Sequence, residues 1–264
     1  MMIEALFIDY VSQVEDYRGK VRKAIGEKNV PLDMVKKISC TDGTLKGVEA
    51  GVSPSAYAQV DALRPHALEF IEGCGLEYEL LERVILQISF DIIRYSKFGG
   101  DFSLGVSQWL VQQQDFVPWI METLERCGVP RQRVVLRLGA RLFTLDRTQE
   151  KLIHAISSVE AAGLKLCLAD FGIGGATPHV LSRCQMHEVK IARHFFAQAR
   201  SDRRAALFLR SMVRMAQGLN ARVILDGVDT PNDVRLARSL GAEMMQGHVF
   251  GTLDQAGQAQ LSDF

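Results

Sequence analysis

The sequence predicts an α/β fold, and within that class a modified (β/α)8 barrel of the TIM type. The chain has 264 residues, which suits one barrel domain or two smaller domains. Strand-like segments alternate with helical segments over short links, a pattern typical of a parallel sheet. About eight strands over roughly 230 residues match a closed barrel. A doubly wound open sheet is the alternative that the pattern leaves open.

The first part of the chain departs from regular alternation. Apolar residues at spacings of three and four predict a helix over residues 3–27. Residues 32–39 and 45–48 read as two strands joined by the turn Thr41-Asp42-Gly43, so the first strand belongs to a hairpin. We therefore expect an N-terminal helical extension over residues 1–28 and a barrel domain over residues 29–264.

The remaining elements follow in alternation. Helices are expected where apolar residues recur at helical spacing, and their ends coincide with stop signals such as Gly128-Val129-Pro130 and Gly241. The predicted helices are residues 77–96, 116–127, 149–162, 179–184, 203–219 and 231–240. The predicted strands are residues 102–106, 134–138, 164–169, 188–191, 222–225 and 244–249.

Composition restricts the partners and the location. Lys plus Arg equals Asp plus Glu, so the formal net charge of zero gives no general attraction to nucleic acid or to an anionic membrane. There is no apolar run long enough to span a membrane and no signal peptide at the start. The five cysteines form no CxxC pair and read as reduced thiols. We expect a cytoplasmic protein that binds neither nucleic acid nor membrane.

Acidic, basic and amide residues gather at the predicted carboxyl ends of the strands, where barrels of this type hold their sites. The segments are Gly47-Val48-Glu49-Ala50, Leu168-Ala169-Asp170-Phe171-Gly172, Val189-Lys190-Ile191, Leu225-Asp226-Gly227-Val228-Asp229 and Gln246-Gly247-His248. In order and spacing this series resembles the EAL family of bacterial cyclic di-GMP phosphodiesterases, over roughly residues 20–253. The resemblance implies an EAL-type barrel and a place in cyclic di-GMP signalling.

EAL enzymes cut a phosphodiester bond with two divalent cations, which need oxygen ligands. The resemblance carries part of that site onto this chain, with two glutamates of the family appearing as shorter aspartates. The retained positions, which we regard as a vestigial active site, are Glu49, Asp170, Lys190, Asp226, Asp229 and Gln246. The acidic members also have an ordinary interpretation as turn or helix-cap residues, and Lys190 as half of a salt bridge.

Three family metal ligands fall on residues that cannot bind a cation: Gly105, Arg137 and Ala169. Arginine stays protonated at any working pH. At about 4 Å and an effective dielectric near 20, each unit-charge pair is worth roughly 4 kcal/mol, so an inward guanidinium would repel the metal. Arg137 would then pair with Glu49 or Asp170; the alternative is an outward side chain, if the strand register differs by one. No catalytic residue, metal or cofactor is expected.

The nucleotide contacts of the family are also incomplete, since its phosphate-binding arginine falls on Ser53. Lys36, Lys37 and Arg137 are possible replacements for binding the nucleotide phosphates, although adjacent strand residues cannot both point into the barrel.

Two main interpretations follow, and a third is weaker. The first is a non-catalytic signalling domain acting on an unidentified protein partner, with possible homodimerisation through residues 174–184, the region the family resemblance suggests. The second is a receptor that binds cyclic di-GMP without metals. An active phosphodiesterase is the third.

Overall fold

The computed structural model describes Gly19 and residues 32–52, 75–94, 98–139 and 148–251. The helix predicted over residues 3–27 lies outside the described residues, Gly19 excepted, and so does most of the loop predicted over residues 50–64.

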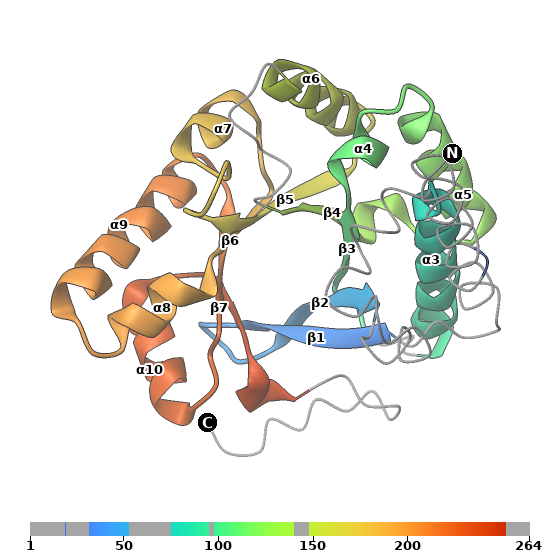
Figure 1. The fold of residues 1–264 in the computed structure, drawn as a ribbon. Coiled ribbons are helices and arrows are strands. Elements are labelled where there is room, and N and C mark those ends of the chain that lie inside the picture. Colours follow the sequence, from blue (N-terminus) through green and yellow to red (C-terminus); the bar gives the residue numbers. More distant parts are fainter. Residues whose placement is uncertain (1–18, 20–31, 53–74, 95–97, 140–147, 252–264) are drawn as a thin grey trace, which may run out of the picture.

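The eight strands close into one barrel, which Figure 1 shows end-on with the helices outside it. Strand β1 is antiparallel to both of its neighbours, β2 and β8, and every other neighbouring pair is parallel. Closure of β1 onto β8 excludes the open-sheet alternative. The strands are β1 (Leu32–Ser39), β2 (Leu45–Val52), β3 (Asp101–Val106), β4 (Val134–Leu138), β5 (Lys165–Phe171), β6 (Glu188–Ile191), β7 (Arg222–Asp226) and β8 (Met244–Gln246).

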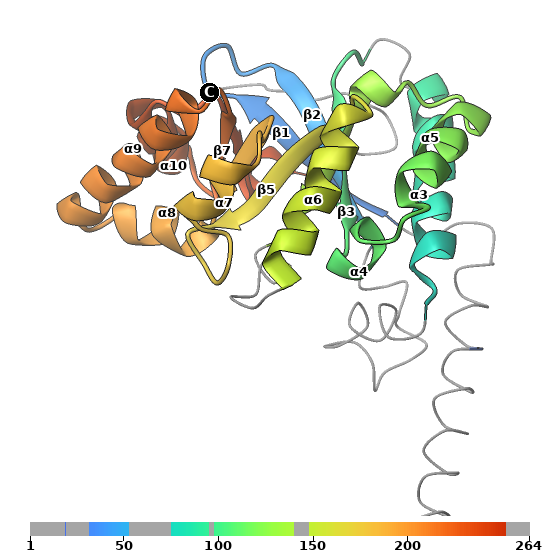
Figure 2. The same cartoon turned by 90° about the horizontal axis from the view of Figure 1, so that it is seen from above.

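The predicted helices in the described residues are all present, and two short ones were not predicted. The helices are α3 (Glu77–Arg94), α4 (Gln108–Val111), α5 (Phe116–Arg126), α6 (Thr148–Ala161), α7 (Pro178–Arg183), α8 (Arg193–Ala199), α9 (Arg203–Gly218) and α10 (Pro231–Leu240), with 3-10 turns at Arg131–Arg133 and His248–Phe250. Helices α4 and α8 are the two additions. Figure 2 shows α6, α7 and α9 lying along the outside of the strands.

The last strand is shorter than predicted because of Gly247. A Cβ atom at Gly247 would lie 2.1 Å from the carbonyl oxygen of Val228, so the two backbones nearly touch there. The chain turns away at that contact and forms the 3-10 turn His248–Phe250 instead of continuing the strand to residue 249.

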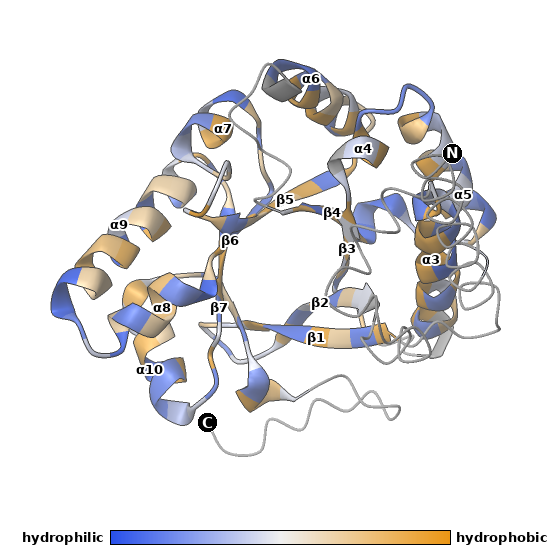
Figure 3. Ribbon diagram, viewed as in Figure 1, coloured by the Kyte–Doolittle hydropathy of each residue, from blue (hydrophilic) through white to orange (hydrophobic). Residues whose placement is uncertain are grey.

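Alternate residues of each strand face outward and inward, and the two sides differ in character. Outward residues such as Phe102, Leu136 and Leu166 form one large buried cluster with the helices. Figure 3 shows hydrophobic residues alternating with hydrophilic ones along α3, as this packing requires. Inside the barrel, a separate small apolar cluster consists of Val135, Cys167, Ile224 and Met244.

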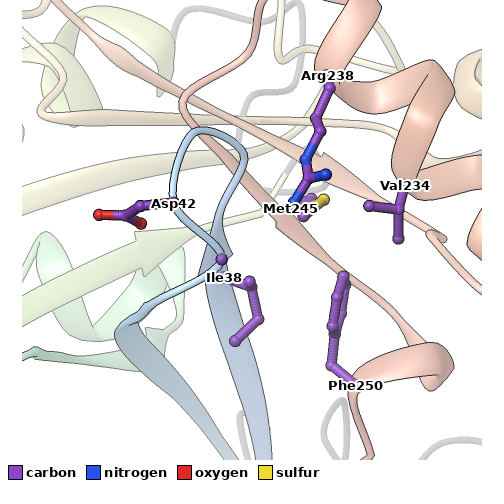
Figure 4. A pocket seen from close by; sticks show the side chains of 7 residues that line it. Ile38, Asp42, Val234, Arg238, Met245 and Phe250 are labelled. Atoms are coloured by element: carbon purple, nitrogen blue, oxygen red, sulfur yellow. The ribbon is translucent and has the colours of Figure 1, made fainter. Parts of the chain in front are cut away.

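One small cavity, of about 130 Å³, lies between the β1–β2 turn, α10 and the turn after β8. Figure 4 shows Ile38, Val234, Met245 and Phe250 lining it, with Arg238 and Asp42 beside them. Ligand sites of drug size usually exceed about 300 Å³, so this cavity fits no more than a small group. Separately, none of the helices in the described part of the chain is both long and apolar enough to cross a membrane.

Candidate functional site

The inward-facing residues at the carboxyl ends of the strands meet around one carboxylate, that of Glu49 on β2. Lys190, from β6 across the barrel, donates to both of its oxygens, with Nζ 3.0 Å from Oε1 and 2.7 Å from Oε2. The Lys190 side chain is 7% exposed and that of Glu49 13%, so the pair is largely shielded from water. The interpretation of Lys190 as half of a salt bridge is therefore confirmed.

Arg137 is the second cation at Glu49. Its Nε lies 3.4 Å from Oε1 of Glu49, an ion pair that needs the side chain to point into the barrel. Arg137 stands opposite Gly105 in the pairing of β4 with β3, so both face the same way. The inward interpretation of Arg137 is confirmed, and of the two expected partners it pairs with Glu49.

The end of β5 contributes little to this cluster. Ala169 is completely buried and presents only a methyl group. Asp170 is exposed, and its backbone is left-handed, with φ of 54°. Its carbonyl oxygen accepts a hydrogen bond from the amide of Ile173 in a tight turn. Asp170 thus has a clear structural role in the loop that follows the strand.

Asp226 and Gln246 end the neighbouring strands β7 and β8, where they are directly paired. Asp226 is partly buried, and its carboxylate accepts a hydrogen bond of 2.8 Å from the amide of Gly227. Gln246 is 4% exposed, and its Oε1 has no hydrogen-bond partner. Both side chains belong to the same rim as Glu49.

Asp229 serves a different neighbourhood, at the start of α10. Its carboxylate pairs with Arg193 and accepts a hydrogen bond of 3.0 Å from the amide of His248. Thr230, the next residue, forms a capping box with Asp233. The interpretation of Asp229 as part of a helix start is thus confirmed, and its carboxylate is held by groups outside the Glu49 cluster.

Lys36 and Lys37 both have protein partners. Lys36 donates to the carbonyl oxygen of Phe250, at 3.0 Å. Lys37 points into the barrel at the opposite end from Glu49, where it is bonded to Glu188 and lies 2.5 Å from the hydroxyl of Ser103. Of the three residues expected to bind nucleotide phosphates, only Arg137 is at the rim with Glu49.

The cations decide the charge state of Glu49. Burial raises the pKa of its carboxyl group, but Lys190 and Arg137 outweigh burial and bring the pKa down to about 2. Burial also raises the pKa of Asp226, which the ammonium group of Lys190 lowers only in part. At neutral pH, Glu49 is therefore an anion whose charge is balanced by the protein itself.

The rim does not fit a pair of divalent cations. Such ions need several oxygen ligands close together. In the part of the chain that the structure describes, no three Asp, Glu, His or Cys side chains lie close enough to hold a metal ion. Glu49 faces two internal cations, while Gly105 and Ala169 have no side-chain oxygen to offer.

Sequence reasoning missed the ionic network at the other end of the barrel. Glu188 pairs with Lys37 and Arg222, and Arg222 also contacts Asp101. The signal was available in part, because Glu188 is two residues before Lys190 and so shares its inward face. Alternation could not identify Lys37 as its partner.

Comparison with known proteins identifies similar sequences and a similar solved structure. The chain is 26% identical over half its length to the cyclic di-GMP phosphodiesterase NbdA of Pseudomonas aeruginosa, and 25% identical over 53% of its length to the antirepressor BluF of Escherichia coli. It spans only 16% of NbdA and 34% of BluF. The solved complex of the phosphodiesterase PaMucR with c-di-GMP superposes with a TM-score of 0.73 at 20% identity, covering 88% of this chain and 95% of PaMucR's.

That structural likeness shows a shared fold. The family assignment comes from the sequence, since the pattern of the EAL domain matches residues 22–252, most of the chain. The protein belongs to the EAL domain family.

Proposed function

We propose that this protein is a non-catalytic EAL domain of cyclic di-GMP-related regulation, which acts by contacting a protein partner. The observation that carries the proposal is the environment of Glu49: both of its oxygens face Lys190, and Arg137 lies against one of them. A carboxylate neutralised in this way is a poor ligand for a divalent cation. The similar protein BluF of Escherichia coli is named an antirepressor, so one relative of this chain has a regulatory name.

The proposal keeps the broader expectations of the sequence. It takes residues 1–28 as an extension and residues 29–264 as the EAL-like barrel, in the cytoplasm. The vestigial active site comprises Glu49, Asp170, Lys190, Asp226, Asp229 and Gln246.

A homodimer is part of the same proposal, and exposed apolar residues next to residues 174–184 support it. Ile173 is 43% exposed, while Leu207 and Phe208 on α9 are 55% and 54% exposed. The ring of Phe208 lies 5.7 Å from that of Phe195, and Phe195 packs against Gly172, the neighbour of Ile173. We call the exposed residues Ile173, Leu207 and Phe208 the α9 face. Exposed apolar patches of this kind mark protein contacts.

The alternative is a metal-independent receptor for cyclic di-GMP, and one observation favours it. Arg137 contributes a cation to the rim, and its buried Nε makes no hydrogen bond. A phosphate oxygen is a suitable acceptor for a guanidinium group. The structural neighbour PaMucR was solved with c-di-GMP.

A calorimetric titration with cyclic di-GMP, run once with Mg²⁺ and once with a chelator, separates these functions. The proposal expects neither heat of binding nor linear product. Binding that persists in the chelator without product would replace it by the receptor. Linear product that depends on Mg²⁺ would refute both, and would make the protein an active phosphodiesterase.

A further inference from the structure

The end of the Arg137 side chain lies beside Gly105, close to where the side chain of any other residue would begin. A Cβ atom at Gly105 would lie 2.9 Å from a terminal nitrogen of the Arg137 guanidinium and 3.7 Å from its central carbon. Apart from residues adjacent to Gly105 in the chain, Arg137 supplies both heavy atoms found within 4 Å of that point. A side chain at position 105 would therefore require the guanidinium to shift from its place.

The guanidinium in that place reaches the one carboxylate at the centre of the rim. Nε of Arg137 is 3.4 Å from Oε1 of Glu49, and the same oxygen is 3.0 Å from Nζ of Lys190. A metal ion bound to Glu49 would have to displace these contacts and would lie beside a fixed positive charge.

We infer that Gly105 and Arg137 are a matched pair that places a guanidinium group against Glu49, and that Arg137, beside Lys190, keeps divalent cations away from this carboxylate. The inference rests on the proposed function in that both require a site working without metals. It adds a specific claim: the two residues are coupled, and cation binding can be recovered by changing them.

Binding of Mn²⁺ alone, measured by calorimetry on the full chain, tests the exclusion. Wild type is expected to bind Mn²⁺ no better than Arg131→Glu, a control that makes the same charge change at an exposed position just before β4. Arg137→Glu is expected to bind about tenfold more tightly or better, because a nearby cation becomes an anion. Arg137→Gln, which is gentler on folding, should show a smaller gain. Adding Glu49→Gln to Arg137→Glu should remove the gain.

Thermal melting of the same proteins tests the coupling. Gly105→Asn alone should lower the melting temperature, since the new side chain displaces Arg137 from Glu49. In the Arg137→Gln background the same substitution should lower it less, because the guanidinium is no longer there. Equal effects of Gly105→Asn in the two backgrounds would refute the pairing.

The remaining outcomes separate this inference from the proposed function. The exclusion is refuted if wild type binds Mn²⁺ as tightly as Arg137→Glu does, or if Arg137→Glu binds Mn²⁺ no more tightly than Arg131→Glu. Either result leaves the proposed non-catalytic function standing. Linear product from cyclic di-GMP refutes the proposed function, whatever the melting experiments show.

Discussion

At the scale of single residues, inward-facing charges are paired at both ends of the barrel. The rim carries Glu49 with Lys190 and Arg137, and the opposite end carries Lys37 with Glu188. Lys37 and Glu188 are each 1% exposed, and the hydroxyl of Ser103 and the guanidinium of Arg222 complete their hydrogen bonds. An ion left alone in such a place is costly, so each partner depends on the other.

Removing the charge of Lys37 should therefore destabilise the protein strongly. Lys37→Met keeps most of the volume but leaves Glu188 with fewer partners, and we expect a loss of about 3–5 kcal/mol in the free energy of unfolding. Urea denaturation measures it. Lys46→Met is the control, because the pair of Lys46 with Asp42 is exposed and solvent screens it. Similar midpoints for the two variants would contradict this account.

At this scale, the sequence predicted the direction of a side chain better than it predicted the partner of that side chain. The resemblance put Arg137 at a metal-ligand position and so favoured an inward side chain with Glu49 or Asp170 as its partner, whereas alternation along β4 left an outward side chain open. The pairing of Lys37 with Glu188 was not predictable in the same way, because 151 residues separate them and periodicity says nothing about partners across a barrel. The Gly105–Arg137 contact also needed the register of two strands.

At the scale of elements, strong end signals made prediction accurate. The predicted bounds of α10 agree with the structure, since Pro231 follows a Thr230 N-cap and Gly241 ends the helix. Helix α8 was missed because it has seven residues and its N-cap, Ala192, makes no side-chain hydrogen bond. Where local signals are absent, packing against the rest of the fold determines the element.

Two glycines at helix ends offer a matched test of this view. Neither Gly241 nor Gly218 has a heavy atom within 4 Å of an added Cβ, but Gly241 has φ of 83° whereas Gly218 is the last residue of α9. Gly241→Ala should cost about 1 kcal/mol of stability, since left-handed backbone strains an alanine. Gly218→Ala should be neutral or stabilising by up to about 1 kcal/mol. Chemical denaturation should give Gly241→Ala a lower free energy of unfolding than wild type, and Gly218→Ala an equal or higher one.

At the scale of the whole molecule, the barrel places its exposed apolar residues on separate sides. The α9 face lies beyond β6 and β7, whereas Phe90, 58% exposed, is on α3, across the barrel from α9 in Figure 1. The order of the elements predicted the fold class and favoured a closed barrel, although the open sheet was excluded only by the pairing of β1 with β8. The location of these surfaces was not predictable, because exposure of a helix face depends on what packs beside it.

The proposed homodimer can be tested with that separation. Phe208→Glu should weaken self-association measured by sedimentation velocity, because a charge would be buried in the α9 face. Phe90→Glu changes an equally exposed aromatic residue elsewhere and should leave association unchanged. Equal effects, or a wild type that stays monomeric at high concentration, would remove the α9 face from the proposal.

The reversed direction of β1 has a practical consequence for anyone who joins another protein to this one. Leu32, the first residue of β1, pairs with Val52, the last residue of β2. The polypeptide chain therefore enters the barrel at the rim that carries Glu49. In an all-parallel barrel the first strand would begin at the other end. A fused reporter or tether attached just ahead of Leu32 is therefore brought to the mouth of the barrel, where it can obstruct a ligand or sense its arrival.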